Sequence, residues 1–197
     1  MADEGWNRNN HYHRLVLQAV PRDCRRALDV GCGTGALARR LADRCGGVVA
    51  IDAHAATLAR ARAATGNGPP LTFVRGDVLT HAFDDGSFDF ISAVAVLHHL
   101  PLEAALGRLK RLLRPGGVVV VIGLYRIETF EDYAWMAAGI ITGLALRSVR
   151  RYTAVSAPMK DPVQSLEEVR CACDAVLPGC ILRRELLLRY SLVWQKP

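Results

Sequence analysis

The alternation of short apolar runs with stretches of helical periodicity is the feature that most constrains the fold of this chain. The central runs are almost entirely apolar, as in strands that are buried on both faces of a sheet. The predicted strands are 26–30, 47–52, 71–75, 88–96 and 118–124, and the predicted helices between them are 36–44, 55–64 and 102–113. Strands that alternate with helices indicate a parallel sheet with helices on both faces. The pattern predicts an α/β, doubly wound, Rossmann-like fold.

The final third of the chain departs from this alternation. Residues 130–151 and 165–176 have helical patterns, and the second begins with a serine followed three positions later by a glutamate, which predicts a capping box. Residues 180–187 and 189–195 predict two more strands with a short connection. Because a tight link cannot join parallel strands, this pair must form an antiparallel hairpin. We therefore expect a mostly parallel, seven-stranded sheet that ends in a β-hairpin.

A glycine-rich loop follows the first predicted strand. Gly31, Gly33 and Gly35 stand between a strand and a helix, where glycines permit a tight turn and let a ligand approach the backbone closely. With Ala36 the loop also fits G-x-G-x-x-A, so an NAD(P)-binding oxidoreductase remains an alternative. Asp52 ends the second strand, 21 residues after Gly31. A carboxylate at that place can accept two hydrogen bonds from a ribose diol.

Four segments, taken in order, resemble the motifs of one family. Residues 27–35 (ALDVGCGTG) resemble the first motif of the class I S-adenosylmethionine-dependent methyltransferases. Three further segments agree in order and spacing: 49–52 with the ribose-binding strand end, 76–78 with the adenine-contacting turn, and 88–100 followed by 113–117 with the fourth-strand and pre-fifth-strand motifs. The group that the chain most resembles is the small-molecule, ubiquinone/menaquinone-methyltransferase-like type. The terminal hairpin is also a feature of that fold.

The resemblance implies that the cofactor is S-adenosyl-L-methionine and that each motif makes a particular contact with it. The implied contacts are Asp29, Gly31, Cys32, Gly33 and Gly35 for the methionyl end, Asp52 for the ribose, Ala53, Asp77 and Val78 for the adenine, and Ala93 and Val94 beside the methionyl group. Charge supports this independently of the family. The cofactor has a net positive charge and no phosphate, which suits a site with three aspartates and no lysine in the loop better than a pyrophosphate would.

Few residues are candidates for removing a proton from the acceptor. His98 and His99 follow the fourth strand, at the carboxyl edge where open α/β sheets bind ligands. We expect one or both to be catalytic, the alternative being that one caps the next helix and the other packs. Tyr12 and His13 precede the first strand, and the resemblance implies an N-terminal segment that folds over the cofactor. They would then line the methyl channel and bind substrate, although a solvated helix start fits equally well.

Residues 125–162 are where acceptor specificity is expected, with Tyr125 and Trp135 as candidate substrate-binding residues. The core of this insertion, residues 133–146, contains no charged residue, and its two glycines stand four positions apart. Three interpretations remain open: a lid over a lipophilic acceptor, a core helix or dimer contact, and a shallow association with a membrane surface. In the third, the arginines at 147, 150 and 151 would meet anionic lipid.

Length and composition favour one domain. The chain has 197 residues, of which 51% are hydrophobic and 22% charged, which is enough for one sizeable core but not for two. We expect a single methyltransferase domain with an N-terminal cap (1–25), a cofactor-binding core (26–124), a helical lid or acceptor insertion (125–162), and a terminal helix and hairpin (163–197).

The net charge of +6 lies almost entirely in residues 101–197, which carry 14 basic and 9 acidic residues. Part of it is predicted on the outer side of the helix 102–113, at Arg108, Lys110, Arg111 and Arg114. The charge alone raises nucleic acid as a partner. Against it, the chain has no N/D-P-P-[YF] or Pro-Cys motif after the fourth strand and no basic run with interleaved aromatics. A small-molecule acceptor is therefore preferred, with a nucleic-acid or protein methyltransferase and a non-catalytic S-adenosylmethionine-binding protein as alternatives.

The ends and the cysteines favour a cytoplasmic protein. The start is polar and acidic, without the basic and apolar regions of a secretory signal, and no apolar run is long enough for a transmembrane helix. The six cysteines have no C-x-x-C spacing, so we expect free thiols and no metal site. The sequence leaves the acceptor, the methylated atom and the oligomeric state open.

Overall fold

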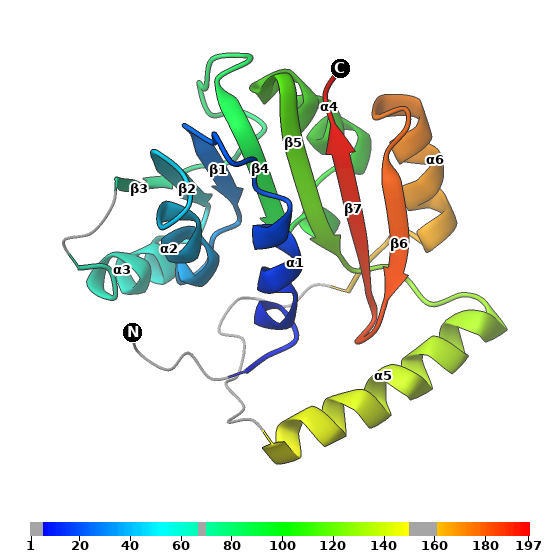
Figure 1. Cartoon of the computed structure of the whole chain (residues 1–197). Helices are drawn as coiled ribbons and strands as arrows, with labels where there is room; N and C mark the ends of the chain where they lie inside the picture. The colour runs from blue at the N-terminus through cyan, green and yellow to red at the C-terminus, as the bar shows by residue number, and fades with distance from the viewer. Residues whose placement is uncertain (1–5, 67–69, 150–160) are drawn as a thin grey trace.

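The computed structural model describes residues 6–66, 70–149 and 161–197, and among these seven strands form one mixed sheet (Figure 1). The strand order is β3-β2-β1-β4-β5-β7-β6. Strands β1 to β5 pair in parallel, and β7 pairs antiparallel with both β5 and β6. The strands are β1 Ala27–Val30, β2 Val48–Asp52, β3 Leu71–Arg75, β4 Phe88–Val94, β5 Leu113–Gly123, β6 Ile181–Glu185 and β7 Arg189–Gln195. The predicted Rossmann-like sheet with a terminal antiparallel hairpin is confirmed.

Helices cover both faces of the sheet, as predicted. Figure 1 shows α1, α2 and α3 on one face and α4 and α6 on the other. One apolar cluster gathers Leu106 of α4 and Val169 of α6, and a second gathers Val16, Leu41 and Leu58 of the opposite helices. The helical elements are η1 Asn10–Tyr12, α1 His13–Gln18, α2 Ala36–Ala42, α3 Ala55–Ala63, η2 Leu97–His99, α4 Leu102–Leu112, α5 Phe130–Val149 and α6 Leu166–Val176.

Local sequence signals explain how α4 and α6 form. The buried residues of α4 recur at helical spacing and form one apolar stripe, which packs against the sheet. At the start of α6 the predicted capping box is present. The Ser165 hydroxyl accepts a hydrogen bond from the backbone N–H of Glu168 (3.2 Å), and the Glu168 carboxylate accepts one from the backbone N–H of Ser165 (2.7 Å).

Several predicted boundaries shift for identifiable reasons. The predicted strand 88–96 ends at Val94 because the next residue, Ala95, has a φ of 53°. The strand predicted to start at 118 starts at Leu113, which pairs with Phe88 before the register shifts. The strand predicted over 180–187 ends at Glu185, before a left-handed turn. The helix predicted over 36–44 ends two residues early, and the one predicted over 130–151 extends to 149, its last two positions lying outside the described residues.

Helix α5 lies beyond the carboxyl ends of the parallel strands, at the lower edge of the molecule in Figure 1. This is the edge at which ligands bind in open α/β sheets. Within the described part of the chain, every helix is too short or too polar to span a bilayer.

Candidate active site

The loop after β1 has a conformation that glycine adopts freely and other residues do not. Gly31, Gly33 and Gly35 have φ angles of 65°, 55° and 76°, where a Cβ costs about 1–2 kcal/mol. Gly31 is also closely covered, because a Cβ there would lie 2.5 Å from the side chain of Val96. A Cβ on Gly33 would have no described atom within 4 Å. The loop is therefore packed at its first glycine and open at its second.

The carboxylate of Asp52 lies against this open part of the loop. Its Oδ2 accepts a hydrogen bond from the backbone N–H of Gly33 (2.9 Å), and its Oδ1 accepts one from the backbone N–H of His54 (2.8 Å). The side chain is 11% exposed, so a ligand can reach it. Backbone N–H groups of Gly31 and Cys32 donate to the carbonyl of Ile51 and join the loop to the end of β2. The structure thus brings the glycine loop and Asp52 into direct contact.

Asp29 lies in β1, immediately before the loop, and is buried. Its Oδ1 accepts a hydrogen bond from the hydroxyl of Ser92 in β4 (2.7 Å), while its Oδ2 is buried without a hydrogen-bond partner among the described residues. Burial raises the pKa of Asp29 to about 7, the Ser92 hydrogen bond opposes this, and the charge of Asp52 adds to it. A buried oxygen without a partner is costly unless a donor or cation reaches it. The two carboxylates favour a positively charged ligand.

The turn after β3 continues the same edge of the sheet. Its Gly76 N–H donates to the carbonyl of Asp52 (3.1 Å), which fixes the turn beside the end of β2. The side chain of Asp77 is exposed, and its Oδ1 accepts a hydrogen bond from the backbone N–H of Leu79 (2.9 Å). Val78 is buried in the core. The three segments in which cofactor contacts were predicted therefore meet along one edge.

Arg108 of α4 supports this turn from behind. Its guanidinium donates to the carbonyls of Val78 (3.4 Å), His81 (2.8 Å) and Phe83 (3.1 Å), and it pairs with the carboxylate of Asp85 (3.1 Å). Arg108 was predicted on the outer side of this helix, but its side chain is only 12% exposed and donates hydrogen bonds within the fold.

The end of β4 closes the edge between the glycine loop and β5. Ala93 is buried and Val94 is half-buried. The next residue, Ala95, has a φ of 53°, and its N–H donates to a carbonyl at the end of β5 (2.7 Å). This strained turn places Val96 over Gly31. A non-glycine residue in the left-handed region is uncommon and is often found near functional sites.

The two candidate base residues have different environments. His98 is buried and His99 is exposed, although both lie in η2. Their ring centroids are 4.0 Å apart with an angle of 40° between the planes. Only His99 therefore presents much of its ring at the surface, and the catalytic role of either residue remains a prediction.

Tyr12 and His13, the predicted lining of the methyl channel, are both buried against the fold. The hydroxyl of Tyr12 donates to the carbonyl of Leu186 in the hairpin turn (2.5 Å), and burial raises the pKa of Tyr12. Burial lowers the pKa of His13 to about 4, and the charge of Arg40 adds to this, so His13 is neutral at pH 7. Both side chains lie where the N-terminal segment packs against the rest of the fold, and their contact with substrate remains a prediction.

The turn of the β6–β7 hairpin connects the N-terminal segment with α5. Three residues join Glu185 to Arg189, and two of them, Leu187 and Leu188, have a φ of 60°, in the left-handed region that leucine rarely adopts. The guanidinium of Arg189 donates to both of their carbonyls (3.3 Å each) and to the side chain of Asn9 (2.9 Å). Leu187 itself is buried. The strained turn is therefore held by contacts from both sides.

Helix α5 rests on this turn through its two glycines. A Cβ on Gly139 would lie 3.0 Å from the backbone nitrogen of Leu187, and one on Gly143 would lie 3.5 Å from the Leu187 side chain. At the start of the helix, the carboxylate of Asp132 accepts hydrogen bonds from the backbone N–H of Thr129 (2.9 Å) and of Glu128 (3.1 Å). The glycine pair thus lets the helix approach the hairpin, as such pairs do between membrane helices.

Tyr125 and Trp135, the predicted substrate-binding residues, lie near the anchored end of α5. Tyr125 is buried after β5, where burial raises the pKa of its phenol, and the guanidinium of Arg184 lies 5.8 Å from its ring centroid. Arg184 also pairs with Glu131 (2.6 Å) and Asp132 (2.9 Å) at the start of α5. Trp135 is half-buried on the helix. Their contact with an acceptor remains a prediction.

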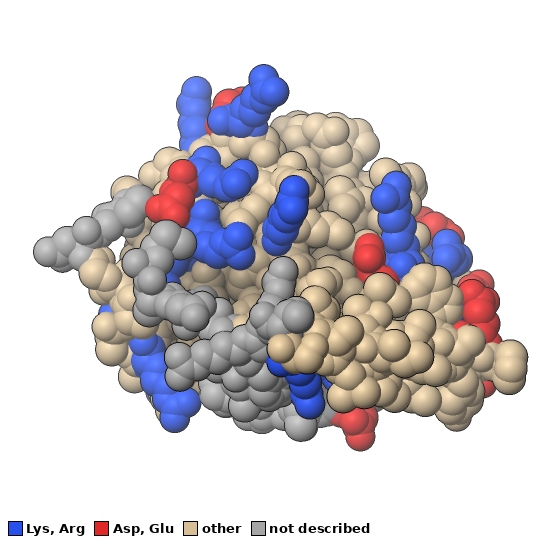
Figure 2. Space-filling model, turned by 60° about the horizontal axis from the view of Figure 1, so that its bottom comes forward, with Lys and Arg blue, Asp and Glu red and all other residues tan. Residues whose placement is uncertain are grey.

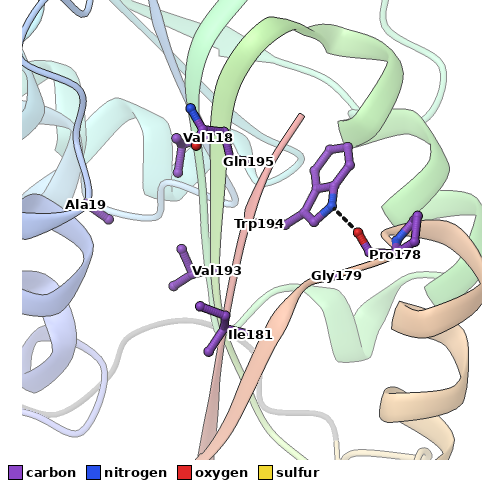
Figure 3. Close-up of a pocket in the computed structure, with 8 residues that line it drawn as sticks. All are labelled: Ala19, Val118, Pro178, Gly179, Ile181, Val193, Trp194 and Gln195. Atoms are coloured by element: carbon purple, nitrogen blue, oxygen red, sulfur yellow. Dashed lines mark hydrogen bonds between the residues drawn. The ribbon is translucent and has the colours of Figure 1, made fainter. Parts of the chain in front are cut away.

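A shallow cleft lies near the start of β6 and the end of β7, away from the carboxyl ends of the parallel strands where the predicted cofactor-binding residues meet (Figure 3). It is mainly apolar and includes Trp194, whose indole N–H donates to the carbonyl of Pro178 (3.0 Å). The lining residues are Ala19, Val118, Pro178, Gly179, Ile181, Val193, Trp194 and Gln195. Within the described ranges no group of His, Cys, Asp and Glu side chains could hold a metal ion, and all six cysteines are free thiols.

Comparison with known proteins decides the family. The family description "Methyltransferase domain" matches residues 28–121. An uncharacterized methyltransferase from Mycobacterium tuberculosis is 36% identical over 198 residues, covering 99% of each chain. The chain belongs to the class I S-adenosylmethionine-dependent methyltransferases. The sterol 24-C-methyltransferase of Schizosaccharomyces pombe is 33% identical to this methyltransferase over 128 residues, which is 62% of this chain and 33% of that protein.

Solved structures show the same fold. A SAM-dependent methyltransferase from Aquifex aeolicus superposes with a TM-score of 0.65 over 94% of this methyltransferase and 89% of that chain, at 18% identity. A phosphoethanolamine N-methyltransferase from Haemonchus contortus, solved with S-adenosylhomocysteine, gives a TM-score of 0.64 over 88% of this chain and 38% of that one, at 19% identity. The cofactor of this methyltransferase is S-adenosylmethionine.

Three residues that shape the site were not singled out from the sequence. Ser92 was visible as the hydroxyl residue within the apolar run 88–96, and a buried hydroxyl needs a partner such as Asp29. Val96 over Gly31 and Leu187 under α5 gave no local signal, because both act through contacts between segments far apart in the sequence.

Proposed function

We propose that this methyltransferase transfers the methyl group to a small, lipophilic molecule by in-line displacement. The observation that carries the proposal is the absence of charged side chains between Tyr133 and Leu146 of α5, at the carboxyl edge of the sheet (Figure 1). Trp135, which is half-buried on this helix, adds aromatic surface. Apolar surface favours an apolar ligand because contact releases water from both. Sterol methyltransferases among the relatives are consistent with this class of acceptor.

The residues around the glycine loop fit S-adenosylmethionine in both charge and shape. The partnerless Oδ2 of Asp29 and the carboxylate of Asp52 suit its cationic groups and ribose hydroxyls, and the open space at Gly33 lets it approach the backbone. We assign the methionyl end to Asp29, Gly31, Cys32, Gly33 and Gly35, the ribose to Asp52, the adenine to Ala53, Asp77 and Val78, and the wall beside the methionyl group to Ala93 and Val94.

The protein's part in the reaction is to align the acceptor and to take up its proton. When bound, the cofactor supplies a methyl group already activated on a sulfonium sulfur. Alignment of the acceptor's nucleophilic atom opposite that sulfur is therefore the main requirement. Proton uptake falls to His99, whose ring is exposed, with His98 holding it through their ring contact.

An acceptor screen with labelled S-adenosylmethionine tests this function. Phenols, quinones, amines and fatty acids, each as a short hydrophilic and a long lipophilic member, are incubated with the enzyme and extracted. We expect label in the lipophilic members of one class. Label only in hydrophilic acceptors, protein or nucleic acid would overturn the proposal. His99→Ala should lower turnover without loss of S-adenosylhomocysteine affinity, measured by calorimetry, and unchanged turnover in both His98→Ala and His99→Ala would exclude the base.

A further inference from the structure

One side of α5 presents large apolar side chains to solvent. Among the described residues, seven large hydrophobic side chains are exposed, and five of them belong to this helix: Phe130 (90%), Tyr133 (54%), Ile140 (48%), Ile141 (68%) and Leu144 (61%). Their spacing of three, four and seven positions places them along one stripe. The opposite side of the helix, with Gly139 and Gly143, packs on the hairpin turn. The stripe therefore faces away from the body of the protein.

The charges around this stripe favour an anionic partner. The carboxylates at the start of α5 are paired within the protein, Glu131 with Arg184 and Glu128 with Arg126. At the other end of the helix Arg147 is exposed, and it is the only charged residue from position 133 to position 149. Figure 2, in which the bottom of Figure 1 is turned toward the viewer, shows an uncharged region at the lower right, with Lys and Arg side chains on its inner side and Asp and Glu side chains along its outer and lower edges.

We propose that α5 docks on the surface of an anionic lipid bilayer, with its axis in the plane of the interface. The exposed apolar side chains would enter the boundary between headgroups and acyl chains, and the basic residues would meet the lipid phosphates. A second copy of the chain would fit the apolar stripe, but it would bring another net charge of +6 toward the first. Charge therefore favours the bilayer over self-association.

This docking would present the carboxyl edge of the sheet to a membrane. A lipophilic acceptor partitions into lipid, so the bilayer would be its source and α5 the element beside its path. This route rests on the proposed function, whereas the docking itself does not require any methyl transfer.

Vesicle flotation with matched variants tests the docking. The full chain is mixed with vesicles of phosphatidylcholine alone or with about one third phosphatidylglycerol, at low and at high salt. Ile141→Glu changes the exposed stripe. Ile181→Glu is the control, because Ile181 is also exposed (54%) and apolar but lies at the start of β6, at the far end of the sheet. Calorimetry with S-adenosylhomocysteine shows that both variants are folded.

We expect the wild type to float with phosphatidylglycerol vesicles, and less of it to float at high salt. Ile141→Glu should lower vesicle binding at least about tenfold, and Ile181→Glu should leave it unchanged. Absence of flotation, or equal loss in the two variants, would overturn the docking. A dimer in sedimentation that Ile141→Glu dissociates would assign the stripe to a second copy instead. Flotation without any lipophilic acceptor in the screen would overturn the proposed function alone, and the reverse result would overturn the docking alone.

Discussion

Asp29 shows how much of the site can be predicted from single residues. Its position before the glycine loop was sufficient to predict it as a cofactor-binding residue. The hydrogen bond between Gly33 and Asp52 agrees with the prediction that the loop and Asp52 lie together at one edge of the sheet. The sequence could not predict that Asp29 is buried against Ser92 with one oxygen left without a partner, because that depends on the pairing of β1 with β4. Residue types identify the chemistry, and tertiary contacts set the pKa.

The raised pKa of Asp29 predicts a pH-dependent affinity for the cationic cofactor. The pKa of Asp29 is about 7 in the folded free protein, against an ordinary value of 3.8. Protonation of Asp29 therefore stabilises the folded state. This contribution is fully present below pH 3.8 and is lost as the pH rises through 7. A cation prefers the ionised carboxylate. The affinity for S-adenosylmethionine should therefore rise by up to about tenfold from pH 6 to pH 8 and level off above pH 8, with release of a proton on binding below pH 7.

Calorimetry in buffers of different ionisation enthalpy measures both the affinity and the proton released. Asp29→Asn should remove the pH dependence between pH 6 and 8, because the amide does not titrate. Equal pH slopes in the wild type and this variant would show that another group titrates on binding.

The open side of Gly33 predicts a substitution that affects the ligand more than the fold. Gly33→Ala adds a Cβ at a φ of 55°, where strain costs about 1–2 kcal/mol, and it meets no described atom of the protein. Gly86→Ala is the matched control, since Gly86 has a φ of 68°, equally open space and a position in another loop. Both should lower the free energy of unfolding by similar amounts in urea, and only Gly33→Ala should weaken S-adenosylhomocysteine binding. A similar affinity in both variants would place the ligand away from Gly33.

At the scale of elements, the strands and helices follow from periodicity, whereas their exceptions follow from packing. The antiparallel hairpin was predicted from the short link between its strands, and the capping box of α6 from Ser165 and Glu168. The positive φ angles of Leu187 and Leu188 could not be predicted, because glycine and asparagine are the residues that usually adopt this conformation. Burial of Leu187 beneath α5 and the hydrogen bonds of Arg189 offset the strain. Such compensation involves several elements and leaves no local pattern.

The close contact between Gly139 of α5 and Leu187 predicts that a side chain at position 139 will displace the helix. Gly139→Val adds three carbons where the Cβ alone would be 3.0 Å from a backbone nitrogen, and overpacking of this kind costs about 1–3 kcal/mol. Ala145→Val on the exposed side is the control. Limited proteolysis should cut α5 faster in Gly139→Val only, while S-adenosylhomocysteine affinity stays the same in both. Equal protection of α5 would mean that its contact with the hairpin is not close.

At the scale of the whole molecule, the shared sheet predicts that the chain unfolds as one unit. The predicted cofactor-binding residues lie at the ends of β1 to β4, while β5 joins these strands to the hairpin on which both the N-terminal segment and α5 rest. Apolar clusters on both faces extend across this junction. Trp6, Trp135 and Trp194 lie in the N-terminal segment, α5 and β7. Thermal transitions followed by circular dichroism and by tryptophan fluorescence should therefore coincide.

The same coupling requires that a ligand at one edge stabilise every part of the chain. S-adenosylhomocysteine at about 100 times its Kd adds about 2.7 kcal/mol to the free energy of unfolding, so both transitions should rise together by roughly 5–10 °C. NAD at the same concentration should leave them unchanged. Variants that keep only one of the three tryptophans would show which part of the chain has a transition temperature that differs from the rest. If the Trp135 signal alone failed to move, α5 would unfold independently of the cofactor-binding strands, and the insertion would be a separate unit rather than part of one domain.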